Sequence, residues 1–347
     1  MKIRLNQKNI PLFATIAVFF LIYAIGGFMY SGFFSLRVFA NLFIDNAFIG
    51  IIAIGMTFVI ISGEIDLSVG SVIAFIGVLL ASLVHDYAMH PMLAILICLV
   101  FGALFGCAMG CLIHFFQLPS FLVTLVGMFL ARGLAFLLSL NSIPIKHPFF
   151  EELVDFGVQL TRKVWIPSTA MVFVAVFILG VYLSHFTKFG RNAYAIGGNE
   201  QSAILMGLPV GKTKILIFTL NGTLCALAGV VYSLYTMSGY PLACVGLELD
   251  VIAAVVIGGT LLTGGVGYVE GTLIGVLILG LIQTFITFQG TLSSWWTKIV
   301  VGVLLFVFIL LQRYLSSAYS GKDMRSEETA SDQGGQASAG ATKEASR

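Results

Sequence analysis

Apolar residues run through this chain in long stretches that polar and charged residues interrupt only briefly. A transmembrane helix needs about 20 mainly apolar residues. Ten stretches reach or approach that length, at residues 11–30, 46–62, 67–84, 92–113, 119–140, 168–186, 214–236, 249–262, 269–288 and 296–315. The pattern predicts an all-α integral membrane protein with about ten transmembrane helices.

Two places depart from this regular pattern. Segment 249–262 is short, so the sequence leaves open whether it spans the membrane or re-enters on one side. Segments 46–62 and 67–84 are separated only by residues 62–66, which allows either a tight hairpin or one interrupted helix. We therefore expect broken or re-entrant segments among the helices.

Composition supports membrane insertion. Of the 347 residues, 59% are hydrophobic and 10% are charged, whereas soluble domains average about 25% charged residues. The 38 glycines suit closely packed membrane helices. The net charge of +2 gives no reason to expect a nucleic-acid partner, so the lipid bilayer is the expected environment.

Basic residues are distributed unevenly between the two predicted sides of the membrane. The N-terminus, the loop around residues 187–213 and the flank of the last segment hold ten lysines and arginines, and the opposite side holds four. An excess of basic residues marks the cytoplasmic side. Both termini are therefore predicted to be cytoplasmic, with a transmembrane domain at 1–315 and a disordered cytoplasmic tail at 316–347, which is rich in Ser, Gly and Ala.

The longest internal segment on the cytoplasmic side is 187–213. Within it, Glu200–Met206 is expected to form a short helix that begins after Asn199 as N-cap and ends at Gly207. On the opposite side, the loop 141–166 contains prolines and is expected to be irregular.

The stretch Gly207–Thr213 resembles a phosphate-binding loop but does not fit one. That motif needs four residues between its glycines and follows a buried strand, whereas Gly207 and Gly211 are separated by three residues that include Pro209. No nucleotide site is therefore expected in this chain, and no cofactor. The cysteines and histidines form no recognisable metal motif, so no metal site and no catalytic residue are expected either.

Glycines and isolated charges inside the apolar stretches need a structural explanation. Gly102, Gly106 and Gly110 recur every four residues, which favours close helix packing within the chain over a subunit interface. Arg132 is expected to face an acidic or carbonyl partner inside the protein. Lys298 is expected to extend back toward the Trp295–Trp296 interface.

Two polar regions within the apolar segments are candidates for the solute path. In the first, Asp66 and Ser68 either cap the helix that follows or, with Ser71, line a polar path. In the second, Asp250 is followed by a glycine-rich stretch that contains Gly258, Gly259 and Thr260. Irregular backbone of this kind must be buried in protein or line an aqueous cavity, so packing and a path role both stay open.

Three motifs in register resemble the permeases of ribose/xylose-type sugar ABC importers. They are Ile65–Ser71, then Gly197–Gly207, then Leu249–Gly267, and the resemblance covers about residues 40–312. Two further stretches, Asn141–Pro148 and Thr291–Lys298, are similar to one of the paired permeases of the galactofuranose importer.

This resemblance implies a division of labour between subunits. A periplasmic sugar-binding protein would deliver a monosaccharide, two permease chains (this one and a second, expected to be a paralogue) would form the path, and a separate ABC ATPase would supply the energy. The family's ATPase-coupling segment corresponds here to Gly190, Arg191, Gly197, Gly198, Asn199, Glu200, Ala203 and Gly207. Glu64 stands where the family pattern usually has glycine, so the role of that loop does not transfer simply.

Other classes of protein make different demands on the sequence. A proton-coupled secondary sugar transporter is the main alternative and would use Glu64, Asp66 or Asp250. A membrane-embedded enzyme would need a convergent catalytic cluster, which the sequence does not suggest, and a passive channel would carry solute without ATP. The expected function is the non-catalytic permease subunit of an ABC importer in the bacterial inner membrane.

Overall fold

The computed structural model describes residues 10–161, 164–291, 293 and 295–310. The chain divides into two compact units, Met1–Gly302 and Val303–Arg347, and the description below concerns the first. The predicted tail at 316–347 and the basic residues of the extreme N-terminus lie outside the described residues, so those two predictions stay untested.

Helices account for most of the described residues. They are α1 (Ile10–Met29), α2 (Leu36–Asp45), α3 (Ala47–Ile61), α4 (Val69–His85), α5 (Pro91–Phe116), α6 (Ser120–Leu138), α7 (Pro148–Asp155), α8 (Ser168–Phe186), α9 (Lys188–Gly198), α10 (Glu200–Leu205), α11 (Val210–Thr236), α12 (Leu247–Ile257), α13 (Val269–Gln289) and a last helix, Trp295–Leu310. Each of the ten predicted segments overlaps one of these helices within the described residues.

Five of the described helices, α5, α6, α8, α11 and α13, are long and apolar enough to cross a membrane. A sixth span arises if α2 and α3, which meet at 60°, count as one. The structure thus confirms a mainly α-helical protein with several apolar spans, whereas ten crossings and cytoplasmic termini stay predictions.

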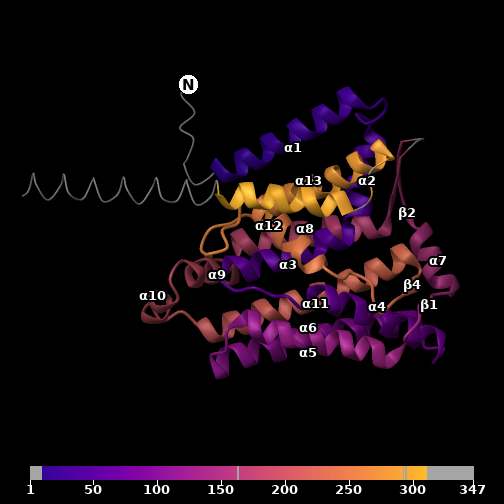
Figure 1. Ribbon diagram of the computed structural model, residues 1–347. Helices are drawn as coiled ribbons and strands as arrows, with labels where there is room; N and C mark the ends of the chain where they lie inside the picture. Colours follow the sequence, from indigo (N-terminus) through magenta and orange to yellow (C-terminus); the bar gives the residue numbers. More distant parts are fainter. Residues whose placement is uncertain (1–9, 162–163, 292, 294, 311–347) are drawn as a thin grey trace, which may run out of the picture. The chain divides into compact units, whose positions relative to one another are not determined.

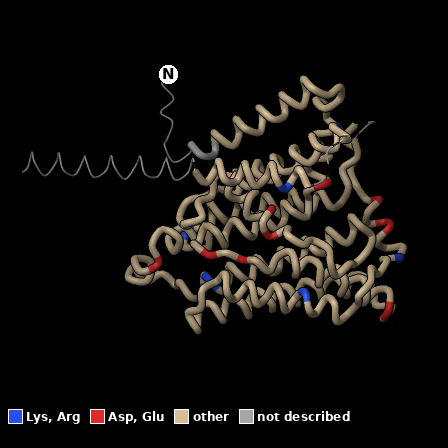
Figure 2. The backbone as a smooth tube through the Cα atoms, in the orientation of Figure 1, with Lys and Arg blue, Asp and Glu red and all other residues tan. Residues whose placement is uncertain are grey.

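The long helices run side by side, and the short elements gather at their two ends (Figure 1). One end carries α9 and α10 and is called the α10 end here. The other carries α7 and two small antiparallel pairs of strands, β1 (Ile143–Pro144) with β4 (Ser238–Gly239) and β2 (Gly157–Thr161) with β3 (Val164–Pro167). Most charged residues lie at these ends, with a few midway along the helices (Figure 2).

The loop predicted to be irregular at 141–166 is instead structured, so that prediction was wrong. His147 caps α7 through its ring nitrogen Nδ1, which accepts from the backbone N–H of Phe149 (3.1 Å), and Pro148 occupies the first turn. The antiparallel pair β2–β3 then follows, in which Val158 lies opposite Ile166. Proline marked a helix start here rather than an irregular segment.

The most extensive helix packing in the unit is a seam between α5 and α11, where glycines bring the two backbones together. A Cβ added to Gly106 would lie 2.2 Å from the carbonyl oxygen of Phe218, and one added to Gly102 would lie 2.5 Å from that of Gly222. The predicted glycine packing is thereby confirmed, within the chain and with α11 as the partner.

Candidate coupling segment and solute path

Side-chain caps define the two short helices of the coupling segment, residues 187–213. The Thr187 hydroxyl accepts from the backbone N–H of Gly190 (3.2 Å) at the start of α9, and Asn199 Oδ1 accepts from Ser202 N–H (2.8 Å) at the start of α10. Gly207 then takes a left-handed conformation with φ +76°, which glycine adopts without steric cost. The predicted N-cap and terminator are both confirmed.

Small residues let the coupling segment pack closely on itself and on the end of α8. Ala203 is completely buried and shares an apolar cluster with Ile196 and Val210. Gly190 lies so close to the end of α8 that a Cβ there would be 2.3 Å from the Ser184 carbonyl oxygen. By contrast, Arg191 is exposed.

The tip of α10 leaves three large apolar side chains in the open. Leu205 is 88% exposed, and its neighbours Ile204 and Met206 are also exposed. Three adjacent exposed apolar residues at the tip of a polar segment are typical of a surface that docks another protein.

Three glycine-bearing segments meet beneath α9, at a contact called the glycine junction (Gly63, Gly197, Gly198, Gly264 and Gly265). A Cβ on Gly197 would lie 1.8 Å from the Ile61 carbonyl oxygen and 2.5 Å from the Gly265 nitrogen. The Gly265 N–H donates to that same Ile61 oxygen at 2.8 Å. The junction therefore joins the coupling segment to the α3–α4 turn and to the α12–α13 loop.

Tyr194 adds a polar contact beside the glycine junction. Its hydroxyl donates to the carbonyl of Gly267 (2.8 Å) and lies 3.1 Å from the Ser184 hydroxyl. Burial raises the pKa of the Tyr194 phenol above its ordinary value, which favours the protonated form that donates this hydrogen bond. The α12–α13 loop is thereby tied to α9 by a side chain as well as by glycines.

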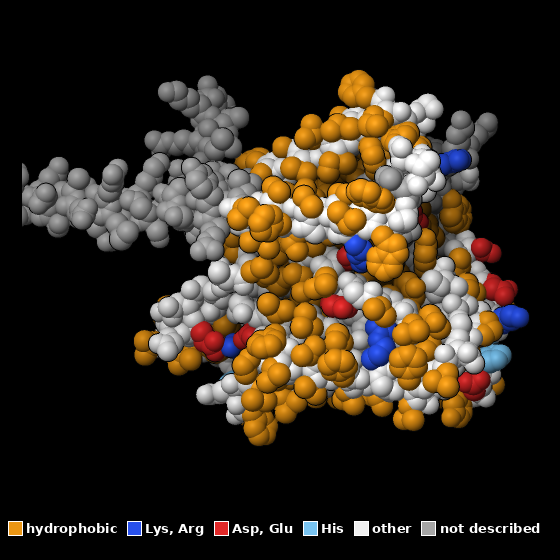
Figure 3. Space-filling model, viewed as in Figure 1, with side chains coloured by type: hydrophobic (Ala, Val, Ile, Leu, Met, Phe, Trp, Pro, Cys, Tyr) orange, Lys and Arg blue, Asp and Glu red, His pale blue; other side chains and the backbone are white. Residues whose placement is uncertain are grey.

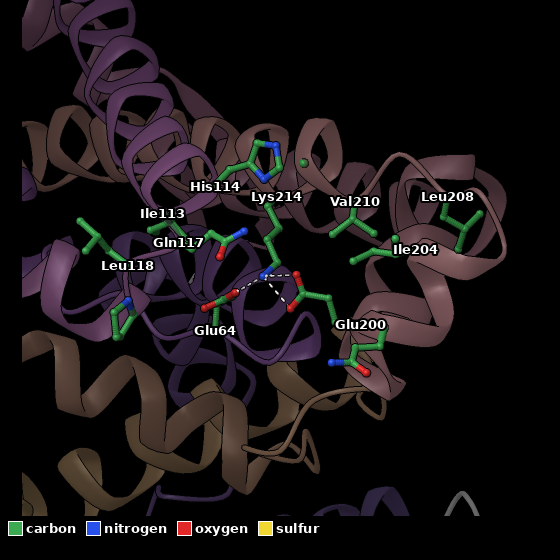
Figure 4. A pocket seen from close by; sticks show the side chains of 13 residues that line it. Glu64, Ile113, His114, Gln117, Leu118, Glu200, Ile204, Leu208, Val210 and Lys214 are labelled. Carbon is green, nitrogen blue, oxygen red and sulfur yellow. Dashed lines mark hydrogen bonds and ion pairs between the residues drawn. The ribbon is translucent and has the colours of Figure 1, made fainter.

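Lys214 joins the coupling segment to the α3–α4 turn electrostatically. Its ammonium lies 2.7 Å from a carboxylate oxygen of Glu64 and 2.9 Å from Glu200, the first residue of α10. The three side chains converge on a cavity of about 740 Å³ that also borders the end of α5 at His114 (Figure 4). Glu64, the departure from the family pattern, thus has a basic partner in this chain.

Asp66 lies at the other end of the same turn and is completely buried. One carboxylate oxygen accepts from the backbone N–H (2.8 Å) and hydroxyl (2.6 Å) of Ser68, and the other accepts from the Asn221 amide (2.8 Å). Asp66 therefore organises the start of α4, as the capping alternative predicted, whereas Ser68 makes no side-chain cap of its own. Ser71 is also buried.

The second candidate region consists of α12 and the turn that follows it. Gly258 packs on α13, where a Cβ would be 2.5 Å from the Gly271 carbonyl oxygen, and Gly259 has φ +95°. Thr260 is buried next to them, while Asp250 is only partly buried and forms an ion pair with Lys298. The candidate path residues thus comprise a buried group (Asp66, Ser68, Ser71, Gly258, Gly259 and Thr260) and the more exposed Asp250.

Two residues at the centre of these networks were not expected from the sequence. From the sequence, Lys214 is one of the basic residues that mark the cytoplasmic side, and Asn221 has no predicted role. A polar side chain in the first half of an apolar segment was the available signal, because such residues are costly in lipid without a partner. Among the residues that the structure describes, no group of three His, Cys, Asp or Glu side chains could hold a metal ion.

Comparison with known proteins places this arrangement in a family. The family model described as "Branched-chain amino acid transport system / permease component" matches residues 38–309. The chain belongs to this permease family. Its glycine junction, coupling segment and broken helices all lie within the matched range.

Individual relatives carry narrower names. The chain is 52% identical over 316 residues to the inner membrane ABC transporter permease protein YjfF of Escherichia coli, covering 91% of this chain and 96% of that one. It is 36% identical to the fructose import permease protein FruG of Bifidobacterium longum (89% and 92% covered). It is 37% identical to the ribose import permease protein RbsC of E. coli (80% and 86%).

These relatives confirm the resemblance to ribose-type ABC permeases that the three motifs suggested. Together with the several apolar spans, they identify the chain as a multi-pass protein of the bacterial inner membrane. No solved structure matches the chain.

Proposed function

We propose that this permease is the membrane subunit of an ABC importer that carries a monosaccharide, galactofuranose or a related sugar, into the cytoplasm. A separate ABC ATPase would hydrolyse ATP, a second permease chain, expected to be a paralogue, would complete the path, and a periplasmic binding protein would deliver the sugar. The named sugar permeases among its relatives support the solute class.

The observation that carries the proposal is that α10 combines an exposed apolar tip with an ion pair to α11. Its tip exposes Leu205 and two apolar neighbours, and its first residue, Glu200, is ion-paired to Lys214. A force applied to the tip would therefore reach α11 directly and the α3–α4 turn through Glu64. This is the connection that an ATPase docking on α10 would need in order to move the broken helices.

The predicted coupling residues and the predicted path residues both enter this proposal. The coupling segment comprises Gly190, Arg191, Gly197, Gly198, Asn199, Glu200, Ala203 and Gly207. For the path, we propose that Asp66, Ser68, Ser71, Gly258, Gly259 and Thr260 hold the broken helices in shape, and that Asp250 lies closer to the moving solute.

A charge placed at the docking tip tests the proposal. Leu205→Asp should lower both co-purification of the ATPase and ATP-driven sugar uptake by about tenfold or more, because burying an unpaired charge costs more than about 1.4 kcal/mol. Leu205→Met is the matched control and should retain both. Uptake and ATPase binding that survive Leu205→Asp would contradict the docking role.

The energy source and the sugar are tested separately. Uptake into cells should stop when ATP is depleted and continue when a protonophore is added at constant ATP. The opposite result would favour a proton-coupled secondary transporter. Labelled galactofuranose should be taken up in preference to ribose and fructose, and a preference for either of those would replace the narrower assignment.

A further inference from the structure

Four ionisable side chains lie within apolar helices, three of them in the first turn of a helix and Arg132 midway along one. Arg132 belongs to α6, Glu248 and Asp250 to the first turn of α12, and Lys298 to the helix Trp295–Leu310. Arg132 comes twelve residues after the start of α6 and six before its end. At 1.5 Å per residue, its Cα lies about 18 Å from one end of the helix and about 9 Å from the other.

Contacts join these side chains into one surface. The Arg132 guanidinium donates to the carbonyl of Ala243 (2.8 Å) and to that of Pro241. Lys298 is ion-paired to Asp250. The segment Pro241–Asp250 therefore lies between α6 and the last helix, and we call it, with Arg132 and Lys298, the charged face.

The charged face is open on its outer side. Lys298 is exposed, and Arg132, Glu248 and Asp250 are partly so. Figure 3 shows red and blue side chains gathered in the middle of a surface that is otherwise mostly apolar.

A surface of this kind is not expected to face the hydrocarbon of the membrane. Residues 240–246 form turns without helical or strand hydrogen bonding, and irregular backbone does not face hydrocarbon. Charged side chains at mid-depth of a membrane face a protein interior or a water-filled cavity. Water and another protein surface must therefore cover this face.

The chemistry of the face indicates what covers it. It holds two acidic and two basic side chains, so its net charge is zero and it offers both donors and acceptors to a neutral, polyhydroxylated solute. Exposed apolar side chains, Leu242, Val245 and Leu249, lie among the charges. A surface with equal numbers of both charges can also pair with its own copy or a close paralogue across a two-fold axis.

We infer that the charged face is one wall of the water-filled sugar path, and that a second permease chain closes the path opposite it. This inference rests on the proposed function, because it takes the solute and the second chain from there. It assigns a place to both: the solute passes along Arg132, Glu248, Asp250 and Lys298, and the partner contacts the apolar residues around them.

Cysteine labelling in membranes that contain the complete transporter tests the assignment. In a background whose five native cysteines are replaced, Val245→Cys and Leu249→Cys probe the charged face. The controls are Leu104→Cys in α5 and Ile178→Cys in α8. Exposed fractions match closely, 66% and 64% for Val245 and Leu104, and 62% for both Leu249 and Ile178.

The controls point away from the unit's interior. Leu104 lies two residues from Gly102 and Gly106, and Ile178 lies two residues from Gly180, which packs on Ile54. Two residues along a helix turn the side chain by about 200°, to the opposite side. Both controls should therefore face lipid.

A membrane-impermeant charged methanethiosulfonate should label the two charged-face cysteines at least about tenfold faster than the controls, since it reacts with thiolates in water. A lipid-soluble maleimide should label the controls at least as fast. Equal, slow reaction of all four positions with the charged reagent would show a lipid-facing surface and overturn the inference.

A benzophenone attached at position 245 then identifies the covering surface. Irradiation should give an adduct with the second permease chain, identified by its epitope tag, and the same probe at 104 should not. An adduct with lipid alone at 245 would overturn the partner assignment. ATP-driven uptake in the same membranes distinguishes failure of the proposed function from failure of the charged-face assignment. If uptake persists while labelling fails, only the charged-face assignment is wrong.

Discussion

Glycines bring backbones into contact at two places in this permease, and they do so in different ways. In the α5–α11 seam, Gly102, Gly106 and Gly222 lie within regular helices, and a Cβ on any of them would come within 2.5 Å of the opposite helix. In the glycine junction, Gly63, Gly264 and Gly265 lie outside helices and have φ values of +82°, +83° and +76°.

This difference indicates two roles: the seam holds helices together, and the glycine junction transmits movement between segments. The seam joins two long apolar helices over much of their length, so its failure should affect assembly of the protein. The glycine junction joins the coupling segment to the α3–α4 turn and the α12–α13 loop through a small contact area. Its failure should leave the helices packed and interrupt the connection between α10 and the path.

Filling the seam should produce the largest effect. Gly106→Leu would place a side chain where even a Cβ lies 2.2 Å from the Phe218 carbonyl oxygen. Overpacking of this kind costs about 3 kcal/mol or more when the backbones cannot separate. Folded permease in the membrane, measured by detergent-resistant size-exclusion profiles, should fall sharply.

Gly133→Leu is the control for the same change in side-chain size. No atom lies within 4 Å of a Cβ at Gly133 in α6, so its folded yield should stay near that of the unchanged protein. Equal losses for the two variants would mean that the seam is no more sensitive than an open helix surface.

Filling the glycine junction should abolish transport without loss of the protein. In Gly197→Ala the new methyl group would meet the Ile61 carbonyl oxygen at 1.8 Å, so α9 must move off the α3–α4 turn. Folded yield should be near normal, whereas ATP-driven sugar uptake should drop by about tenfold or more.

The adjacent glycine provides a matched control. A Cβ on Gly198 meets nothing within 4 Å, so Gly198→Ala should transport sugar normally. If both variants transport equally well, the glycine junction does not carry the coupling.

The seam and the junction also differ in how far the sequence predicted them. The four-residue spacing of Gly102, Gly106 and Gly110 specified a packing face, because helical periodicity is local. The glycines of the junction come from three segments separated by more than 60 residues each, and no local pattern tells which of them meet. Their motifs were noticed one by one, but their contact was not.

The reach of local sequence signals also explains which other sequence-based predictions were correct and which were wrong. The cap at Asn199 and the terminator at Gly207 depend on neighbouring residues and were predicted correctly. The structured loop at 141–166 is where the prediction failed: Pro148 begins α7 behind the His147 cap, which is a local signal for a helix start, whereas the β2–β3 pairing leaves no mark in the prolines. Lys214 connects α10 to the α3–α4 turn through Glu64, which is 150 residues away in the chain.

Removing the Lys214 ion pairs should weaken coupling less than filling the glycine junction. Lys214→Met would leave Glu64 without its partner in a largely buried position. Loss of one partner of a fully buried ion pair costs about 3–5 kcal/mol. Part of this cost should be relieved because water can enter the adjoining cavity. We expect uptake to fall several-fold, measured as a lower maximal rate with little change in half-saturation.

A double variant shows whether the loss comes from the unpaired Glu64 charge or from the missing ion pair. Lys214→Met with Glu64→Gln removes both charges of the pair and should recover most of the lost rate, since no buried carboxylate is left unpaired. A double variant that is as slow as Lys214→Met alone would mean that the ion pair itself, rather than its balance, is required.

The smallest effect should come from a glycine that shares the left-handed backbone of the junction but not its contacts. Gly207 has φ +76°, and no atom lies within 4 Å of a Cβ there. Gly207→Ala should therefore cost only the backbone term, about 1 kcal/mol, and reduce uptake by about fivefold or less.

Gly207→Asn tests whether backbone conformation is the cause, because asparagine tolerates the left-handed region better than alanine. Its uptake should lie between that of Gly207→Ala and that of the unchanged permease. If Gly207→Ala instead abolishes uptake as Gly197→Ala does, then position 207 makes a contact in the assembled transporter that the isolated chain does not show. The end of α10 would then belong to the docking surface together with Leu205.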